Sequence, residues 1–136
     1  MASESQACAV LVVDDDQDTV DVICSFLGAN GVRAVPAHDG SQALEVLESG
    51  LKPSLILLDL KMPSSGWSFR AKQLANRDWS AIPVAIVTGM VGNAKALAQN
   101  LQLPTDHVVF KPLTPDKLDD LLQRYCPAAP PDRVIH

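Results

Sequence analysis

Aromatic residues are scarce in this 136-residue sequence, since Phe, Trp and Tyr make up only 4% of it. Its hydrophobic fraction is nevertheless 47%, so we expect an aliphatic core. Basic residues are also in deficit, with 11 Lys and Arg against 16 Asp and Glu. The resulting net charge of −5 argues against binding to nucleic acid or to an anionic membrane, because both require a basic face.

Long apolar runs are missing as well. No run approaches the ~18 residues of a membrane-spanning helix, and the N-terminus lacks the basic and apolar segments of a signal peptide. The three cysteines, Cys8, Cys24 and Cys126, show neither paired spacing nor a metal-binding pattern. We therefore interpret all three as reduced thiols of a cytosolic protein, with Cys8 and Cys24 acting as small core residues.

Short apolar runs alternate with segments of helical periodicity. The runs, read as strands, cover residues 8–13, 32–37, 55–58, 82–87 and 107–110. Helices are predicted over residues 20–27, about 41–49, 67–76, 94–101 and 115–125. Because parallel strands need crossover connections and helices must cover both faces, this alternation predicts an α/β fold with a doubly wound, five-stranded parallel sheet.

The sequence marks some helix boundaries more clearly than others. Asp18 and Thr19 are expected to cap the first helix, whereas residues 63–66 are expected to form a turn after the third strand. The last helix has the strongest start, with Thr114 at the N-cap and Pro115 at the first helical position. We expect one domain over residues 8–126, a disordered segment over 1–7 and a Pro-rich tail or linker over 127–136.

Polar residues stand at the carboxyl ends of four predicted strands. They are Asp14 with Asp15, Asp59, Thr88 and Lys111. The carboxyl ends of parallel strands meet at one edge of the sheet, where open α/β sheets bind ligands, so these side chains are expected to converge. Clustered carboxylates repel one another unless a proton or a cation neutralises them. Oxygen ligands without His or Cys favour Mg²⁺, with Mn²⁺ as a substitute.

This set of side chains suits phosphoryl transfer. A carboxylate supplies the attacking oxygen, while a metal and the Lys111 ammonium offset the charge of the transferred group. The Thr88 hydroxyl can donate a hydrogen bond to a phosphoryl oxygen. Each residue alone could be a helix cap, a turn former or an ordinary strand residue. Their shared position at the ends of separate buried strands favours a common site.

Four motifs in order carry a family resemblance: Val-Val-Asp-Asp-Asp at 12–16, Leu-Asp-Leu-Lys-Met-Pro at 58–63, Val-Thr-Gly at 87–89 and Phe-Lys-Pro-Leu at 110–113. Together they resemble the receiver domain of response regulators in bacterial two-component systems, over about residues 8–125. The resemblance implies a flavodoxin-like (βα)5 fold with strand order 2-1-3-4-5. It also implies that Asp59 accepts a phosphoryl group from a histidine kinase or a histidine phosphotransfer protein.

The same resemblance implies further roles. Asp15 would bind Mg²⁺ directly and Asp14 largely through water, with Asp59 and the main-chain carbonyl of Lys61 as the other ligands. Thr88 would move toward the phosphoryl group and Lys111 would pair with it, with a cis peptide bond before Pro112. A downstream protein would bind the fourth helix, fifth strand and fifth helix of this cytoplasmic domain, which is not a classical enzyme and contacts neither nucleic acid nor membrane.

Two positions depart from the family pattern. The loop from Pro63 to Gly66 is one residue shorter than usual. The switch aromatic of the family lies three residues before the lysine, where this chain has Val108. His107 is expected to point to the opposite face of the strand and is a poor substitute for that aromatic.

Two alternatives remain open. The segment Asp16-Gln17-Asp18-Thr19-Val20 locally matches the nucleophile motif of haloacid-dehalogenase-type phosphatases, although Asp14 and Asp15 intervene between it and the strand. The second alternative is a pseudo-receiver that binds its partner without phosphorylation, as the short loop and Val108 suggest. For the phosphorylation-controlled receiver, the output is expected to be contact with another protein, onward phosphotransfer or control of a domain outside this chain.

Overall fold

The computed structural model describes residues 8–59, 63–89, 94–104 and 107–126. The elements follow in the order β1 (Ala9–Val13), α2 (Gln17–Ala29), β2 (Arg33–Ala37), α3 (Gly40–Glu48), β3 (Leu55–Asp59), α4 (Pro63–Ala75), β4 (Val84–Thr88), α5 (Ala94–Asn100), β5 (Val108–Phe110) and α6 (Pro115–Tyr125). The main-chain carbonyl of Lys61 and the segments 1–7 and 127–136 lie outside the described residues, so the expectations for them stay predictions.

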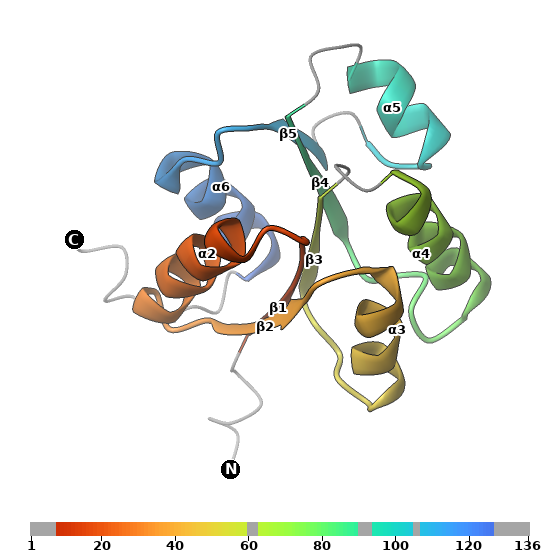
Figure 1. The fold of residues 1–136 in the computed structure, drawn as a ribbon, viewed down its shortest axis with the longest axis horizontal. Coiled ribbons are helices and arrows are strands. Elements are labelled where there is room, and N and C mark those ends of the chain that lie inside the picture. The colour runs from red at the N-terminus through yellow and green to blue at the C-terminus, as the bar shows by residue number, and fades with distance from the viewer. Residues whose placement is uncertain (1–7, 60–62, 90–93, 105–106, 127–136) are drawn as a thin grey trace.

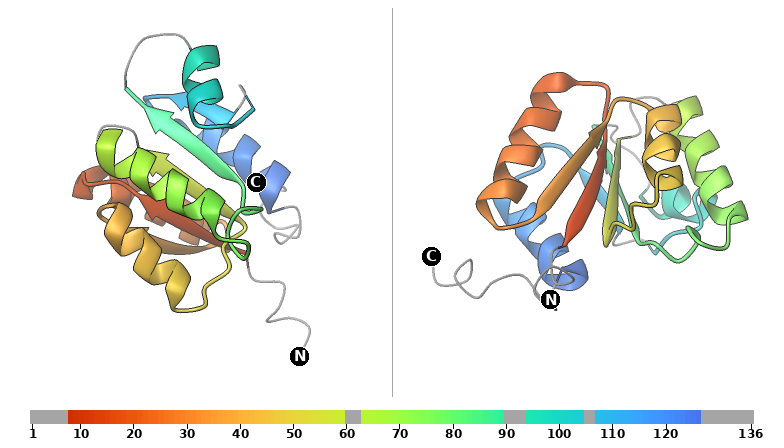
Figure 2. Two further views of the ribbon diagram at one scale, coloured as in Figure 1. Left: turned by 90° about the vertical axis from the view of Figure 1, so that its right-hand side faces the viewer. Right: turned by 90° about the horizontal axis from the view of Figure 1, so that it is seen from below.

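The strands form a five-stranded sheet in the order β2-β1-β3-β4-β5, and all neighbouring pairs are parallel. This confirms the predicted α/β fold and strand order. Helices α2 and α6 cover one face of the sheet, and α3, α4 and α5 cover the other (Figure 1). Figure 2 shows the sheet between these two layers of helices.

Strand periodicity distributes the core between the two faces. In β1, Val10 and Val12 pack in the cluster beneath α2 and α6, whereas Leu11 and Val13 pack in the cluster beneath α3, α4 and α5. All five residues of β3 and of β4 are buried, as expected for strands covered on both faces. Phe69 is the only aromatic among the buried core residues that the structure describes, which confirms an aliphatic core.

Two predicted helix starts were wrong. Helix α2 begins at Gln17 with Asp16 at the N-cap, because the Asp16 carbonyl already accepts a hydrogen bond from the Val20 N–H at 3.0 Å. Helix α4 begins at Pro63, so residues 63–66 belong to its first turn rather than to a separate turn. Proline is favoured in the first turn of a helix, where its missing N–H costs nothing.

The start of α6 agrees with the sequence. Thr114 is the N-cap, its hydroxyl oxygen accepts a hydrogen bond from the Lys117 N–H at 3.3 Å, and Pro115 opens the helix. Leu118, Leu121 and Leu122 are buried against the sheet. In the described part of the chain, no helix is long and apolar enough to cross a membrane.

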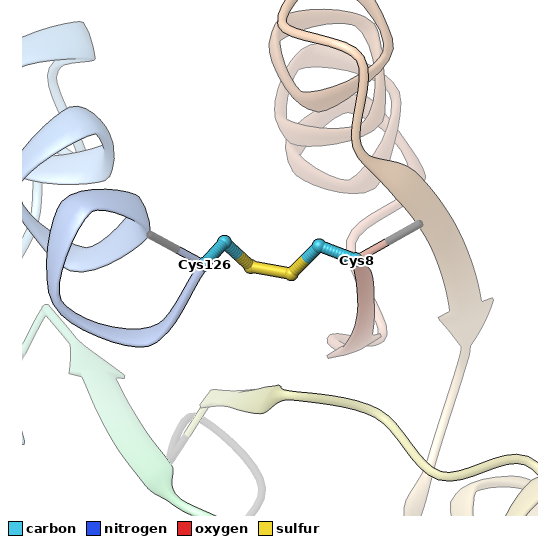
Figure 3. The surroundings of a disulfide bond; sticks show 2 residues. All are labelled: Cys8 and Cys126. Atoms are coloured by element: carbon cyan, nitrogen blue, oxygen red, sulfur yellow. A yellow bond between two sulfur atoms is a disulfide. The ribbon is translucent and has the colours of Figure 1, made fainter. Parts of the chain in front are cut away.

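The cysteines require a correction. Cys8 and Cys126 form a disulfide across 118 residues, so the prediction of reduced thiols was wrong for both (Figure 3). Sequence spacing could not reveal this pairing, because it depends on α6 packing in the same apolar cluster as the start of β1. Cys24 is a free, half-buried thiol on α2.

Candidate functional site

The predicted carboxylates meet at the carboxyl ends of β1 and β3. Val13 of β1 is aligned with Leu58 of β3, so the next residues, Asp14 and Asp59, lie side by side. Both are only 2% exposed, whereas Asp15 is exposed. One ligand oxygen from each of Asp14, Asp15 and Asp59 lies within 4.8 Å of the others. The sequence therefore identified this acidic cluster correctly.

Local hydrogen bonds fix the end of β1. The Asp14 N–H donates to the Ala37 carbonyl of β2 at 3.0 Å, which extends the ladder by one residue. The Asp14 Oδ1 atom in turn accepts a hydrogen bond from the Asp16 N–H at 2.9 Å. The Asp14 carboxylate is thereby held at the strand end, facing Asp59, rather than turned toward solvent.

The lysine that follows β5 brings positive charge to this pocket. The Lys111 Nζ atom lies 3.5 Å from Asp59 Oδ1 and 3.7 Å from Asp14 Oδ2. The Lys111 N–H donates to the Thr88 carbonyl at 2.8 Å, and the Lys111-Pro112 peptide bond is cis, as predicted. The Lys117 ammonium, on α6, donates to the carbonyls of Phe110 and Pro112 at 2.8 and 3.1 Å and thereby holds both sides of this turn.

The pKa of Asp14 reflects its burial and the charges around it. The pKa of Asp14 is raised from the ordinary 3.8 to about 6, mainly by burial and also by the neighbouring Asp59. The Asp16 N–H and the Lys111 ammonium act in the opposite direction and lower the pKa. One lysine does not neutralise three carboxylates, so the pocket favours a cation.

The donor set fits the metal that the sequence predicted. All three side chains offer carboxylate oxygens, and none of the described His or Cys residues joins the cluster. Hard oxygen ligands in this number suit Mg²⁺, which keeps several waters and takes few carboxylates. Asp14, Asp15 and Asp59 would hold the ion.

Thr88 lies at the same edge of the sheet. It is the last residue of β4, it is fully buried, and its register partner in β5 is Phe110, the residue before Lys111. In the pairing of β3 with β4, Asp59 is aligned with Val87, the residue before Thr88. Thr88 therefore ends the strand that separates Asp59 from Lys111.

The switch position and its neighbour face opposite sides. Val108 packs in the cluster beneath α3, α4 and α5, whereas the His107 ring contacts the Tyr125 ring on α6 at a centroid distance of 5.3 Å. The prediction that His107 points away from the switch face is confirmed. His107 is tied there, because its Nδ1 atom lies 2.9 Å from the Val84 carbonyl and its Nε2 atom is hydrogen-bonded to the Tyr125 hydroxyl.

A buried polar network that the sequence did not predict lies away from the acidic pocket. Arg70 is 6% exposed, and its guanidinium donates to the Leu101 and Gln102 carbonyls at 2.9 and 3.0 Å and to Gln73 Oε1 at 2.8 Å. The fully buried Gln73 amide donates to the Trp79 and Ile82 carbonyls at 2.9 and 3.0 Å. This network holds α4 to the segments after α5 and before β4, and no spacing in the sequence distinguishes Arg70 from an exposed arginine.

Comparison with known proteins identifies the family of this chain. The family model of the response regulator receiver domain matches residues 10–123. The chain belongs to this family. The receiver interpretation is thereby confirmed and the haloacid-dehalogenase alternative is set aside. Asp16, which that alternative required as nucleophile, is the N-cap of α2 and accepts a hydrogen bond from the Thr19 hydroxyl at 2.7 Å.

Sequence relatives of this receiver domain differ in length. An uncharacterized 14.6 kDa protein of Leptolyngbya boryana is 32% identical over 126 residues, which are 90% of this chain and 93% of that protein. The transcriptional regulatory protein CpxR of Escherichia coli is 31% identical over 109 residues, which are 80% of this chain. The receiver domain spans only 45% of CpxR.

Solved structures share the fold. The chemotaxis protein CheY4 of Vibrio cholerae superposes with a TM-score of 0.74 at 23% identity, covering 88% of this chain and 98% of that one. A two-component response regulator of Legionella pneumophila superposes with a TM-score of 0.75 at 22% identity, covering 87% and 97%. These likenesses support the fold assignment of the receiver domain.

Proposed function

We propose that this receiver domain accepts a phosphoryl group on Asp59 from a phosphohistidine of a histidine kinase or a histidine phosphotransfer protein. The observation that carries the proposal is the position of Asp59, buried beside two further carboxylates and 3.5 Å from the Lys111 ammonium. A buried carboxylate can act as a nucleophile when nearby positive charge stabilises the incoming phosphoryl oxygens. The Lys111 ammonium supplies such charge, and Mg²⁺ held by the acidic cluster would add to it.

Each side chain has a role in the transfer. An Asp59 carboxylate oxygen attacks phosphorus, the bond from phosphorus to the donor imidazole nitrogen breaks, and the imidazole keeps the electron pair. Lys111 pairs with a phosphoryl oxygen, and Thr88 donates its hydroxyl hydrogen to another. Bound Mg²⁺ would offset negative charge on the same oxygens, held by Asp14, Asp15, Asp59 and the Lys61 carbonyl.

We propose that the downstream protein binds a surface formed by α5, β5 and α6. A groove of about 500 Å³ runs along β5 and α6, and it carries both apolar and charged side chains: Val108, Val109, Phe110, Asp116, Lys117, Asp120, Leu121 and Arg124. Such a mixture suits a protein partner with its own charged rim. We place the domain in the cytoplasm, where a histidine kinase would supply the phosphoryl group.

The proposal is tested by intact mass after incubation with Mg²⁺ and acetyl phosphate. Wild type is expected to gain one phosphoryl group, whereas Asp59→Asn gains none. Asp78→Asn removes an exposed carboxylate outside the acidic cluster and serves as the matched control, which is phosphorylated like wild type.

Different results are expected if the domain is a pseudo-receiver. Its wild-type mass would not change with acetyl phosphate, and Mg²⁺ would not alter tryptophan fluorescence. Binding of its protein partner would also be unaffected by Asp59→Asn. Either observation would replace phosphorylation with constitutive binding as the function of this domain.

A further inference from the structure

A disulfide joins the two ends of the described domain. Cys8 immediately precedes β1 and Cys126 immediately follows α6, and their Cα atoms lie 5.9 Å apart across 118 residues of sequence. This Cα separation lies within the range of about 4.4–6.8 Å that disulfides span. Cys8 is 7% exposed and Cys126 is 2% exposed, so both belong to the apolar cluster beneath α2 and α6.

Main-chain hydrogen bonds hold both cysteines independently of the sulfur–sulfur bond. The Cys8 carbonyl accepts a hydrogen bond from the Arg33 N–H of β2 at 2.9 Å. The Cys126 N–H donates to the Leu122 carbonyl of α6 at 2.6 Å. Reduced thiols would therefore remain close together, and closing the bond would be an intramolecular step.

We propose that Cys8 and Cys126 form a reversible redox staple that controls how firmly the end of α6 is held to the start of β1. Disulfides in cytoplasmic proteins are usually transient or redox-sensing rather than permanent. The staple therefore adds a redox input to the phosphorylation input of the proposed function. It differs from that function in both its chemistry and its location.

The staple closes by thiol–disulfide exchange with a small disulfide such as oxidised glutathione. One cysteine thiolate attacks the glutathione disulfide, forms a mixed disulfide and releases one glutathione thiolate. The second cysteine thiolate attacks the protein sulfur and releases the other glutathione. The two protein thiols lose two electrons and two protons, and one glutathione disulfide becomes two glutathione molecules. Excess reduced glutathione or dithiothreitol reverses both steps.

Burial does not prevent this exchange. Cys8 precedes the first strand and Cys126 follows the last helix, so a reductant needs only local opening where these two elements meet rather than unfolding of the sheet. A second contact holds the same helix end in place, because Tyr125 is hydrogen-bonded to His107. Opening the disulfide therefore loosens the last turn of α6 without detaching the whole helix.

The staple lies away from the acidic pocket. Cys8 precedes β1, whereas Asp14 follows the carboxyl end of that strand. Helix α6, by contrast, lines the groove with Leu121 and Arg124. Redox state is thus expected to change the stability of the domain and the mobility of α6, while phosphorylation of Asp59 proceeds at the same rate in both forms.

The test uses the full chain with Cys24→Ser, which removes the free half-buried thiol and leaves the pair. The protein is equilibrated in glutathione buffers of graded redox ratio, free thiols are trapped by alkylation, and intact mass counts them. The disulfide is expected to form and to reopen as the ratio changes. The melting temperature of the oxidised form should exceed that of the reduced form by about 10 °C, because the closed loop is long.

Amide hydrogen exchange localises the effect. The last turn of α6 is expected to exchange at least about tenfold faster after reduction, whereas the amides of β3 keep their relative protection. Cys8→Ser and Cys126→Ser, each combined with Cys24→Ser, should behave like the reduced form in every glutathione buffer. If a serine variant does not fold, the glutathione titration of Cys24→Ser alone still decides the question.

Three results would overturn the proposal. The thiols would stay free in the most oxidising buffer, or the disulfide would resist excess dithiothreitol in the native protein, or oxidation would change neither melting temperature nor exchange in α6. Phosphorylation of Asp59, measured on the same samples, reports separately on the proposed function. A domain that is never phosphorylated can still show the redox response, and the converse also holds.

Discussion

The Lys111 ammonium lies 3.5 Å from Asp59 Oδ1, although Asp59 ends β3 and Lys111 follows β5, and these strands are not neighbours in the sheet. Strand β4 separates β3 from β5, so the lysine side chain reaches past the end of β4, where Thr88 lies. The cis peptide bond after Lys111 and the Lys117 ammonium shape the turn from which this side chain extends. The Asp59 carboxylate, Thr88 and the Lys111 ammonium are therefore brought together by strand order.

The first prediction concerns this lysine. Lys111→Met is expected to slow phosphorylation of Asp59 by about 10²-fold, because a preorganised positive group near the phosphoryl oxygens is lost. Lys111→Arg keeps the charge but not the compact ammonium, so it should recover only part of the rate. The measurement is the rate of mass gain with acetyl phosphate at fixed Mg²⁺. Equal rates for Lys111→Met and wild type would remove the lysine from the mechanism.

The second prediction concerns the Thr88 hydroxyl. Thr88→Val preserves the shape of this fully buried side chain but cannot donate a hydrogen bond, so phosphorylation should slow about tenfold. Thr88→Ser keeps the hydroxyl and should remain close to wild type. The two variants are compared by the same mass assay, after their melting temperatures have been measured. A Val variant that is phosphorylated as fast as the Ser variant would argue that the hydroxyl has no part in transfer.

The third prediction is a pH dependence of stability in the metal-free protein. The pKa of Asp14 is about 6 in the folded protein, above the ordinary 3.8. Between these pH values the folded chain binds a proton that the unfolded chain has released, so the free energy of unfolding falls as pH rises from about 4 to about 6. The shift corresponds to roughly 3 kcal/mol.

Asp14→Asn isolates this contribution. The amide keeps an oxygen acceptor for the Asp16 N–H but carries no charge, so the variant should be more stable than wild type at pH 7.5 and should lose that advantage near pH 4. Urea unfolding at both pH values, in the presence of a chelator, measures the difference. Mg²⁺ should stabilise wild type more than the variant. A stability difference that is the same at both pH values would contradict the assigned pKa.

The fourth prediction concerns the buried arginine. Arg70→Met leaves the Leu101 and Gln102 carbonyls without the hydrogen bonds that the guanidinium donates. The free energy of unfolding should fall by about 2–4 kcal/mol, because buried acceptors that lose their donors are costly. Arg77→Met, at an exposed arginine after the same helix, should change it by less than about 0.5 kcal/mol. Equal urea midpoints for the two variants would show that the network contributes no stability.

The sequence predicted the elements whose signals are local. The buried run Leu55–Leu58 and the polar residue after it were enough to locate β3 and Asp59, and parallel pairing then brings Asp14 beside it. Thr114 and Pro115 marked the start of α6 because cap preferences depend on neighbouring residues. The ambiguous starts of α2 and α4 had competing signals, since aspartate and serine favour both caps and turns.

Contacts between distant segments were not predictable in the same way. The pairing of Cys8 with Cys126 depends on how α6 packs against the sheet, which no cysteine spacing encodes. Arg70 is buried because the segment that follows α5 presents two carbonyl groups to it, and a positive residue on a helix carries no sign of such acceptors. Both features follow from tertiary packing rather than from local pattern.

The most direct measurement locates the phosphoryl group. The domain is phosphorylated with acetyl phosphate and Mg²⁺, treated with hydroxylamine, which converts an aspartyl phosphate to a hydroxamate, and digested for peptide mass analysis. We expect one modified residue, Asp59, and no hydroxamate when Mg²⁺ is replaced by a chelator. Modification at another aspartate, or none in the presence of Mg²⁺, would contradict the assignment of Asp59 as the phosphoacceptor.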